Sequence, residues 1–272
     1  MKPVKFDYVR ADNVDDACTV LAEFGDDARI LAGGQSLLPM LNMRLAQLRV
    51  LVDISQMAKL NFIRIEDDSL CIGASVTQAS LEWRDNLATE LPLVSQAFPH
   101  ISHFQIRNRG TVCGSIAHAD PSAELPLCLL ALGGDIVLRS KRGTRNVSAD
   151  NFFLGTLRTA REGDEFIEAV RYPLAKPNQR FAFEEFSMRH GDYAIVSVAV
   201  VADETGLRIA VGGVADRPVS QYWRGASGND RASILNDFSM SLEAQPDQHS
   251  SAEYRKHLVR ILGKKVIADV ML

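Results

Sequence analysis

The stretch ILAGGQSLLPMLNMRL (residues 30–45) places Gly33 and Gly34 between an apolar run and a helix-like run. A turn between a strand and a helix is a common place to hold a phosphate group. The dinucleotide-binding Rossmann motif is the first candidate, and Asp53 follows Gly34 by 19 residues, about where a ribose-binding acid would stand. The G-x-G-x-x-G pattern would, however, need a glycine where Gln35 stands. This stretch alone is therefore equally compatible with a simple tight turn.

A second glycine element, RNRGTVCGSIAHADPSAELP (residues 107–126), favours the phosphate interpretation. Gly110 and Gly114 allow close backbone approach, and Thr111 and Ser115 add hydroxyl donors. Successive N–H groups in such turns form a concave site for an anion. Two such sites could hold the two halves of one pyrophosphate, whereas a phosphate monoester would need only one.

Composition narrows the classes of partner. The chain has 272 residues and a formal net charge of -4, which argues against a nucleic-acid or anionic-membrane surface. Its first residues, MKPVKFDYVR, have no apolar segment, and no stretch approaches the roughly 18 apolar residues of a membrane span. We therefore expect a cytoplasmic protein that binds small molecules and other proteins.

The first glycine turn needs a strand and a helix on either side, and the sequence predicts both. Asn13 is a suitable N-cap for a short amphipathic helix that ends before Gly25. A strand over residues 28–34, a helix over 36–47 and a buried strand over 48–55 follow. The first 56 residues are therefore predicted to form a small α/β lobe.

The rest of the chain has an α+β texture rather than regular βαβ units. Short strands and helices are predicted up to about residue 172, and then an antiparallel meander and a helical tail over residues 250–271. The polar segment 223–233 is predicted to be turn-rich. We expect three lobes, over residues 1–56, 57–172 and 173–272.

Four ordered motifs carry a family resemblance: AGGQSLLPMLNMRL, IRNRGTVCGSIAHADPSAELP, RHGDYAIV and AEYRKHL. The chain resembles the FAD-binding medium subunit of the molybdenum hydroxylases, which include carbon monoxide dehydrogenase and xanthine dehydrogenase. The resemblance implies a two-lobed α+β FAD-binding domain of the PCMH type, similar to that of vanillyl-alcohol oxidase. A C-terminal α+β domain with an antiparallel sheet and helices would follow it.

The resemblance also implies which residues would hold FAD. The two glycine elements would bind the pyrophosphate, Ile101 and Ala117 would pack near the flavin, and Tyr193 would lie close to the isoalloxazine ring. Asp120 and Glu124 would bind polar groups of the cofactor, and Ile167 would line the adenine end. The full set is Ala32, Gly33, Gly34, Gln35, Ser36, Leu37, Ile101, Thr111, Cys113, Gly114, Ser115, Ala117, Asp120, Glu124, Ile167 and Tyr193.

Three positions depart from the family pattern. Cys113 replaces the first paired glycine of the usual T-x-G-G-S, and Glu124 stands where an aspartate is frequent. Glu185 stands where many relatives have a lysine, so a lysine contact to the flavin is not expected here.

The four cysteines, Cys18, Cys71, Cys113 and Cys128, are scattered without a C-x-x-C pair, and we expect buried free thiols. The resemblance therefore implies partners: a large subunit with a molybdopterin-type molybdenum cofactor and a small subunit with two [2Fe-2S] clusters, in a heterotrimer or its dimer. This chain would be the FAD-binding electron-transfer subunit and would pass electrons to an external acceptor.

Two alternatives stay open: a free-standing flavin oxidoreductase with its own substrate, and a noncatalytic nucleotide-binding or assembly module. No catalytic side-chain set is evident. His100 and His103 have a spacing that suits a metal on a helix, but no further ligand is apparent, and we expect no metal site.

Overall fold

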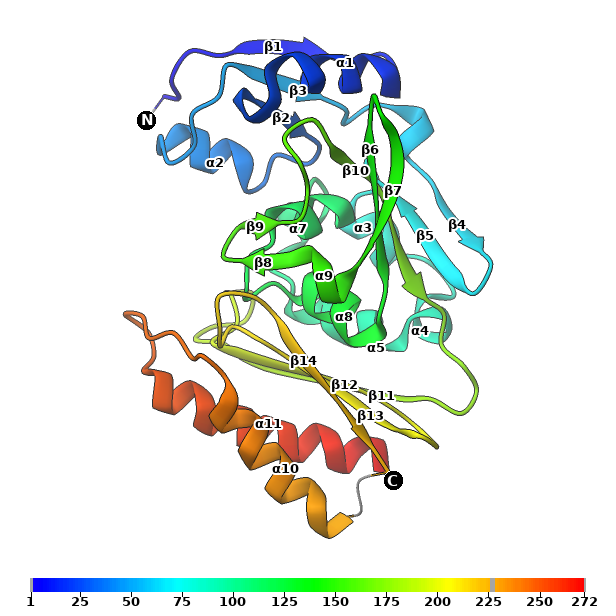
Figure 1. Ribbon diagram of the computed structural model, residues 1–272, viewed down its shortest axis with the longest axis vertical. Coiled ribbons are helices and arrows are strands. Elements are labelled where there is room, and N and C mark those ends of the chain that lie inside the picture. The colour runs from blue at the N-terminus through cyan, green and yellow to red at the C-terminus, as the bar shows by residue number, and fades with distance from the viewer. Residues whose placement is uncertain (1, 226–227, 272) are drawn as a thin grey trace.

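The computed structural model describes residues 2–225 and 228–271. Three main sheets follow one another along the long axis of the molecule, from the N-terminal sheet at the top of Figure 1 to the C-terminal sheet and its two helices at the bottom. The strand content is mixed parallel and antiparallel, and helices lie against each sheet. The predicted α+β class is therefore confirmed.

The first sheet is parallel, in the order β1-β3-β2, and carries the first glycine turn at the end of β2. Asn13 caps α1 as predicted, because its side-chain oxygen accepts a hydrogen bond from the Asp16 amide at 2.9 Å. The helix predicted over residues 36–47 is shorter, since the chain leaves the helix before Arg44, whose φ is 60°. The elements are β1 Asp7–Arg10, α1 Val14–Phe24, β2 Ala28–Leu31, α2 Leu37–Asn42 and β3 Val50–Asp53.

The second sheet is antiparallel, in the order β4-β5-β10-β6-β7. Its helix α8 is buried along almost its whole length because it packs between this sheet and the third. The strands are β4 Ile63–Glu66, β5 Ser69–Gly73, β6 Asp135–Ser140, β7 Gly143–Ser148 and β10 Phe166–Pro173, with the small pair β8 Phe153–Gly155 and β9 Arg158–Thr159. The helices are α3 Gln78–Glu82, α4 Leu87–Glu90, α5 Pro92–Ala97, α6 Phe104–Arg107, α7 Val112–His118, α8 Glu124–Leu132 and α9 Ala149–Phe152.

The third sheet is the predicted antiparallel meander, followed by the predicted helical tail. Its strands are β11 Arg180–Phe186, β12 Val196–Asp203, β13 Gly206–Gly212 and β14 Val219–Arg224, and its helices are α10 Gly228–Ser241 and α11 Ala252–Met271. Alternate residues of β12 face opposite ways: Ala199 packs toward the second lobe, whereas Val198 and Val200 pack toward the two helices.

The turn-rich prediction for residues 223–233 fits Gly225, a bend with a φ of 57°, but is wrong for the other described residues; Ala226 and Ser227 lie outside the described residues. β14 extends to Arg224 and α10 begins at Gly228. Polar residues dominate α10, and it is held through a few buried side chains, including Phe238, whose ring contacts Trp223 at 6.3 Å between centroids. Tertiary contacts of this kind outweigh a weak local pattern.

The four cysteines are free and buried, as predicted. Within the described ranges, no helix is both long enough and apolar enough to cross a membrane. We propose the same three lobes, over residues 1–56, 57–172 and 173–272, because each main sheet falls almost wholly within one of them.

Candidate cofactor site

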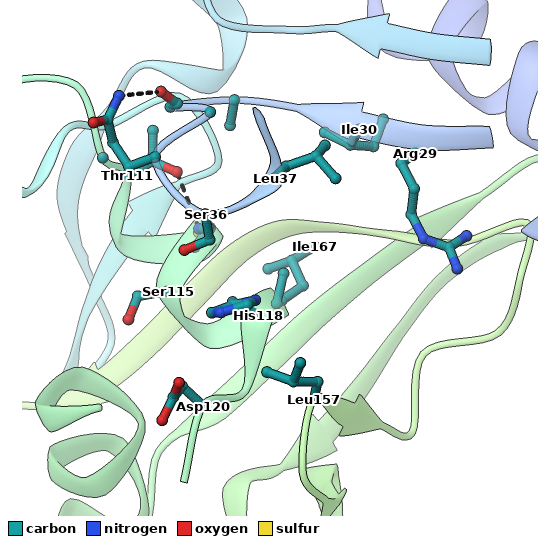
Figure 2. A pocket seen from close by; sticks show the side chains of 18 of the residues that line it. Arg29, Ile30, Ser36, Leu37, Thr111, Ser115, His118, Asp120, Leu157 and Ile167 are labelled. Carbon is teal, nitrogen blue, oxygen red and sulfur yellow. Dashed lines mark hydrogen bonds between the residues drawn. The ribbon is translucent and has the colours of Figure 1, made fainter. Parts of the chain in front are cut away.

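One cavity of about 1020 Å³ lies where the three lobes meet, and the sixteen residues predicted to hold a cofactor all line it. Its size is at the upper end for a small-molecule site and suits an extended dinucleotide. Figure 2 shows the polar side chains of Ser36, Ser115 and Asp120 on one side of this pocket and Arg29 on the other. Segments far apart in the sequence therefore converge on a single space.

The first glycine loop lies directly against the second. A Cβ atom added at Gly33 would stand 2.2 Å from the Arg109 carbonyl oxygen and 2.7 Å from the Gly110 Cα. Both are backbone atoms, so no side chain fits at this position. Gly34 has a φ of 72°, a conformation that favours glycine. The two positions thus require glycine for different reasons. Gly33 lets the first loop contact the second closely, and Gly34 adopts the left-handed conformation of the turn.

The first loop offers free backbone donors to the cavity. The Leu38 amide donates to the Gly34 carbonyl at 3.1 Å and begins the helical pattern of α2. In the part of the chain that the structure describes, the amides of Gln35, Ser36 and Leu37 have no protein acceptor. Amides without acceptors at the start of a helix are suited to an anion.

The second loop is arranged differently from our expectation. Thr111 caps α7, because its Oγ1 accepts a hydrogen bond from the Gly114 amide at 3.0 Å. The amides of Val112 and Ser115 also donate to protein carbonyls, at 3.1 Å each. Three of the five amides from Thr111 to Ser115 therefore already donate to acceptors within the protein. The amides of Thr111 and Cys113 and the Ser115 hydroxyl are donors of this loop for which no such partner is found among the described residues.

Cys113 reaches the cavity through its backbone rather than its thiol. Its side chain is 3% exposed, and its Sγ lies 3.4 Å from the Ile72 carbonyl of the second sheet. Burial raises the pKa of this thiol far above its ordinary value, so the group stays neutral. The departure from glycine is accommodated because the thiol is directed into the protein.

A group of acids and one tyrosine forms the end of the cavity next to the third lobe. Glu124, the first residue of α8, is 6% exposed, and burial together with the charge of Asp120 raises its pKa to about 7. Tyr193 is 59% exposed although it lines the cavity, so its ring presents a free face there. Partial desolvation and the charges of Asp120 and Glu124 raise the pKa of Tyr193 to about 12, and Ser36 acts in the opposite direction.

Two arginines line the part of the cavity away from this acidic group, and the sequence did not predict that they would lie there. Arg29 and Arg161 line the cavity with Ile167, and each donates through its Nη1 to backbone carbonyls, for example Arg161 to the Glu165 oxygen at 2.9 Å. Burial and the charge of Arg29 lower the pKa of Arg161 from its ordinary value. Neither arginine belongs to a recognisable local motif, and only the packing of β2 near the loop before β10 brings them together.

His100 and His103 do not come together with further ligands. The His100 ring packs on Phe183, with 5.3 Å between ring centroids. Among residues 2–225 and 228–271, no group of three or more histidine, cysteine, aspartate or glutamate side chains has an arrangement that could hold a metal ion.

Comparison with known proteins identifies the family. The model of the FAD-binding domain in molybdopterin dehydrogenases matches residues 4–175. The chain belongs to this family. It is 39% identical to subunit alpha of the 6-hydroxypseudooxynicotine dehydrogenase complex of Paenarthrobacter nicotinovorans, over 100% of this chain and 96% of that one. It is also 34% identical to caffeine dehydrogenase subunit beta of Pseudomonas sp. strain CBB1, over 98% of this chain and 95% of that one.

A solved structure shows the same fold. The match to a chain of carbon monoxide dehydrogenase from Hydrogenophaga pseudoflava has a TM-score of 0.94 and 31% identity, and covers 100% of this chain and 99% of that one. The family resemblance and the fold predicted from the sequence are thus confirmed. This FAD-binding chain is a medium-type subunit of the molybdenum hydroxylases, a family of oxidoreductases.

Proposed function

We propose that the cavity between the three lobes holds one FAD, bound noncovalently by the sixteen predicted residues. The observation that carries this proposal is the convergence of two glycine loops, an acidic end and a free tyrosine ring on one cavity. Gly33 and Gly34 would let the first loop approach the pyrophosphate, whose charge the free amides of that loop would stabilise. Ser36 and Ser115 would add hydroxyl donors, Asp120 and Glu124 would accept from cofactor hydroxyls, and Ile101, Ala117 and Ile167 would supply apolar contacts.

We propose that the chain acts as the electron-transfer subunit of a heterotrimeric molybdenum hydroxylase or its dimer. FAD, when bound, accepts electrons and passes them on. Electrons from the substrate would leave a molybdopterin-type molybdenum cofactor in a large subunit, pass through two [2Fe-2S] clusters of a small subunit, and reach an external acceptor by way of this chain. The four cysteines of this chain are free and buried, and none belongs to a C-x-x-C pair, so the clusters are assigned to the partner.

The substrate would be selected by the large subunit. The relatives are named for 6-hydroxypseudooxynicotine, caffeine and carbon monoxide, although their medium chains align along nearly the whole of this one. N-heteroaromatic compounds, aldehydes and carbon monoxide therefore all belong in the panel of substrates to be assayed. Purification of the native complex, with identification of the co-eluting chains, tests the proposed assembly. If the chain elutes alone and fully active, the alternative of a free-standing flavin oxidoreductase replaces it.

Tyr193→Ala should keep FAD bound but change the flavin's absorption spectrum, its potential and its oxidation by acceptor. The reason is that the ring presents an exposed face to the cavity, whereas the glycine loops that would hold the pyrophosphate are untouched. An aromatic ring against a flavin shields one face and alters its solvent access. Tyr193→Phe keeps the ring and should behave nearly as the wild type. An alanine variant with unchanged spectrum, potential and acceptor rate would make Tyr193 an ordinary packing residue.

A further inference from the structure

The motif AEYRKHL, one of the four that carry the family resemblance, lies at the start of α11 and contains Arg255. Figure 1 shows α11 along the third sheet, on the side away from the second lobe. Arg255 is 5% exposed, and it is not among the residues that line the cofactor cavity. A charged side chain is rarely buried so deeply unless its donors are used. The hydrogen bonds of Arg255 therefore indicate its role.

The guanidinium group of Arg255 donates to two strands at the point where their pairing ends. Its Nη1 donates to the Ile195 carbonyl oxygen at 2.7 Å and also to the Gly213 carbonyl oxygen. The pairing of β12 with β13 ends at Ser197 and Gly212, so both carbonyls lie just beyond it. Buried carbonyls outside a ladder need another donor. Arg255 supplies this donor and joins the ends of the two strands.

Asp247 fixes the direction of the guanidinium group. Its Oδ2 accepts a hydrogen bond from the Arg255 Nη2 at 2.5 Å. Its Oδ1 accepts from the amides of His249 and Ser250, at 2.9 Å each. The loop before α11 is thus folded around this carboxylate, and a charge-assisted hydrogen bond ties the arginine to it. The Arg255 Nε has no partner in the part of the chain described, so Nη1 and Nη2 make the contacts.

Gly213 extends the connection to the second lobe. Its φ of 75° lies in the left-handed region, which ends the extended strand. Its amide donates to the Pro121 carbonyl oxygen at 2.8 Å. Pro121 directly follows Asp120, which lines the cavity. Arg255 is therefore connected through a single residue to the acidic end of the cavity.

The same contacts hold the backbone that carries Tyr193. This residue is 59% exposed, so packing of its own side chain does little to fix its place. On one side, a Cβ atom added at Gly191 would stand 2.8 Å from the His103 ring, so the loop rests on the second lobe. On the other side, a Cβ atom added at Gly213 would stand 2.7 Å from the Ile195 carbonyl oxygen. The backbone of Tyr193 is thus held between two close contacts, and Arg255 bonds both partners of the second.

We propose that Arg255 is a positioning residue for the cofactor site, which joins the ends of β12 and β13 and thereby holds Tyr193 where its ring can lie against the flavin. This proposal rests on the proposed function, in which FAD occupies the cavity. Arg255 acts through backbone atoms and does not contact the cofactor itself. Its loss should therefore change the surroundings of the flavin ring and leave the hold on the pyrophosphate in place.

The connection is tested first in the full chain without FAD, by hydrogen exchange of residues 191–197 and of the Gly213 amide. Arg255→Met removes the donors and keeps a long side chain, so exchange at both places should become at least about tenfold faster. Arg260→Met is the matched control, because Arg260 lies on the same helix and its Nη1 donates to Ser239 of α10. Unchanged exchange in Arg255→Met, or equal acceleration in Arg260→Met, would overturn the proposal.

A milder variant decides the matter if Arg255→Met does not fold. Asp247→Asn alters a side chain that is 46% exposed, and its remaining oxygen can still accept from the amides of His249 and Ser250. An NH₂ group would replace the oxygen that Arg255 uses, so the arginine would lose its direction. Exchange of residues 191–197 should again become faster, though less than in Arg255→Met. Exchange at the wild-type rate would count against the positioning role.

The effect on the cofactor is measured in the FAD-loaded chain, through the flavin's absorption spectrum and reduction potential. Arg255→Met should shift both in the direction seen in Tyr193→Ala, while the affinity for FAD changes by less than about threefold. In the Tyr193→Ala background it should add no further shift, because residues that act as one unit are not additive. Additive shifts, or a spectrum and potential like those of the wild type, would make Arg255 a residue of the fold alone. Since the exchange experiment needs no flavin, failure of the positioning role is distinguishable from failure of the chain to bind FAD.

Discussion

Replacing Gly33 by alanine should leave the folded chain largely free of FAD. A methyl group at this position would stand 2.2 Å from the Arg109 carbonyl oxygen, a backbone atom that cannot rotate away as a side chain can. The two glycine loops would have to separate, and the donors of the first loop would move relative to those of the second. We expect FAD binding to weaken at least about tenfold, or about 1.4 kcal/mol, as measured by flavin content and by titration with FAD.

Two further glycine variants and a control separate loop contact from general strain. Gly34→Val forces a β-branched residue to a φ of 72°, and Gly114→Val places its Cβ 2.6 Å from the Thr111 Oγ1 that caps α7. Both should also be folded but depleted of flavin. Gly143→Ala, at the first residue of β7, has a φ of 127° and no atom within 4 Å of the added carbon, so it should keep its flavin. Normal flavin content in the Gly33, Gly34 and Gly114 variants, with folding checked by circular dichroism, would refute the two-loop model.

The isolated FAD-loaded chain should show no turnover of the substrate that its complex oxidises. It contains neither the proposed molybdenum site nor the iron–sulfur relay, so its flavin has no route to substrate electrons. Reduction of a dye by the physiological substrate should appear only when the large and small subunits are added. Chemical reduction and reoxidation of the flavin in the isolated chain is the control, because it shows that the cofactor is competent. Dye reduction by the chain alone at the rate of the full complex would reject the subunit assignment.

The sequence predicted the parts of the fold that local patterns encode. Asn13 predicted α1 through its capping chemistry, and the nearly continuous apolar run of β12 predicted a strand of the meander. The pairs of glycines pointed to the two loops that line the cavity. These signals are local, since a cap or a turn is specified by residues within a few positions of each other.

Long-range packing accounts for what the sequence did not predict. Nothing in the sequence around Gly33 indicates that the Arg109 carbonyl occupies the place of its side chain. Likewise, Arg29 and Arg161 share the cavity only through the packing of distant strands. Glu185 departs from the family pattern in the sequence, but its place opposite the buried Ser197 of β12 is visible only in the fold.

The flavin content of the purified chain tests the central claim most directly. The proposed site holds one FAD per chain, so the protein should be yellow, with an absorption band of oxidised flavin at about 450 nm. Acid precipitation should release the flavin into the supernatant as FAD, because the proposed contacts are noncovalent. A colourless chain that FAD cannot restore, flavin that stays with the precipitated protein, or FMN in place of FAD would contradict the account.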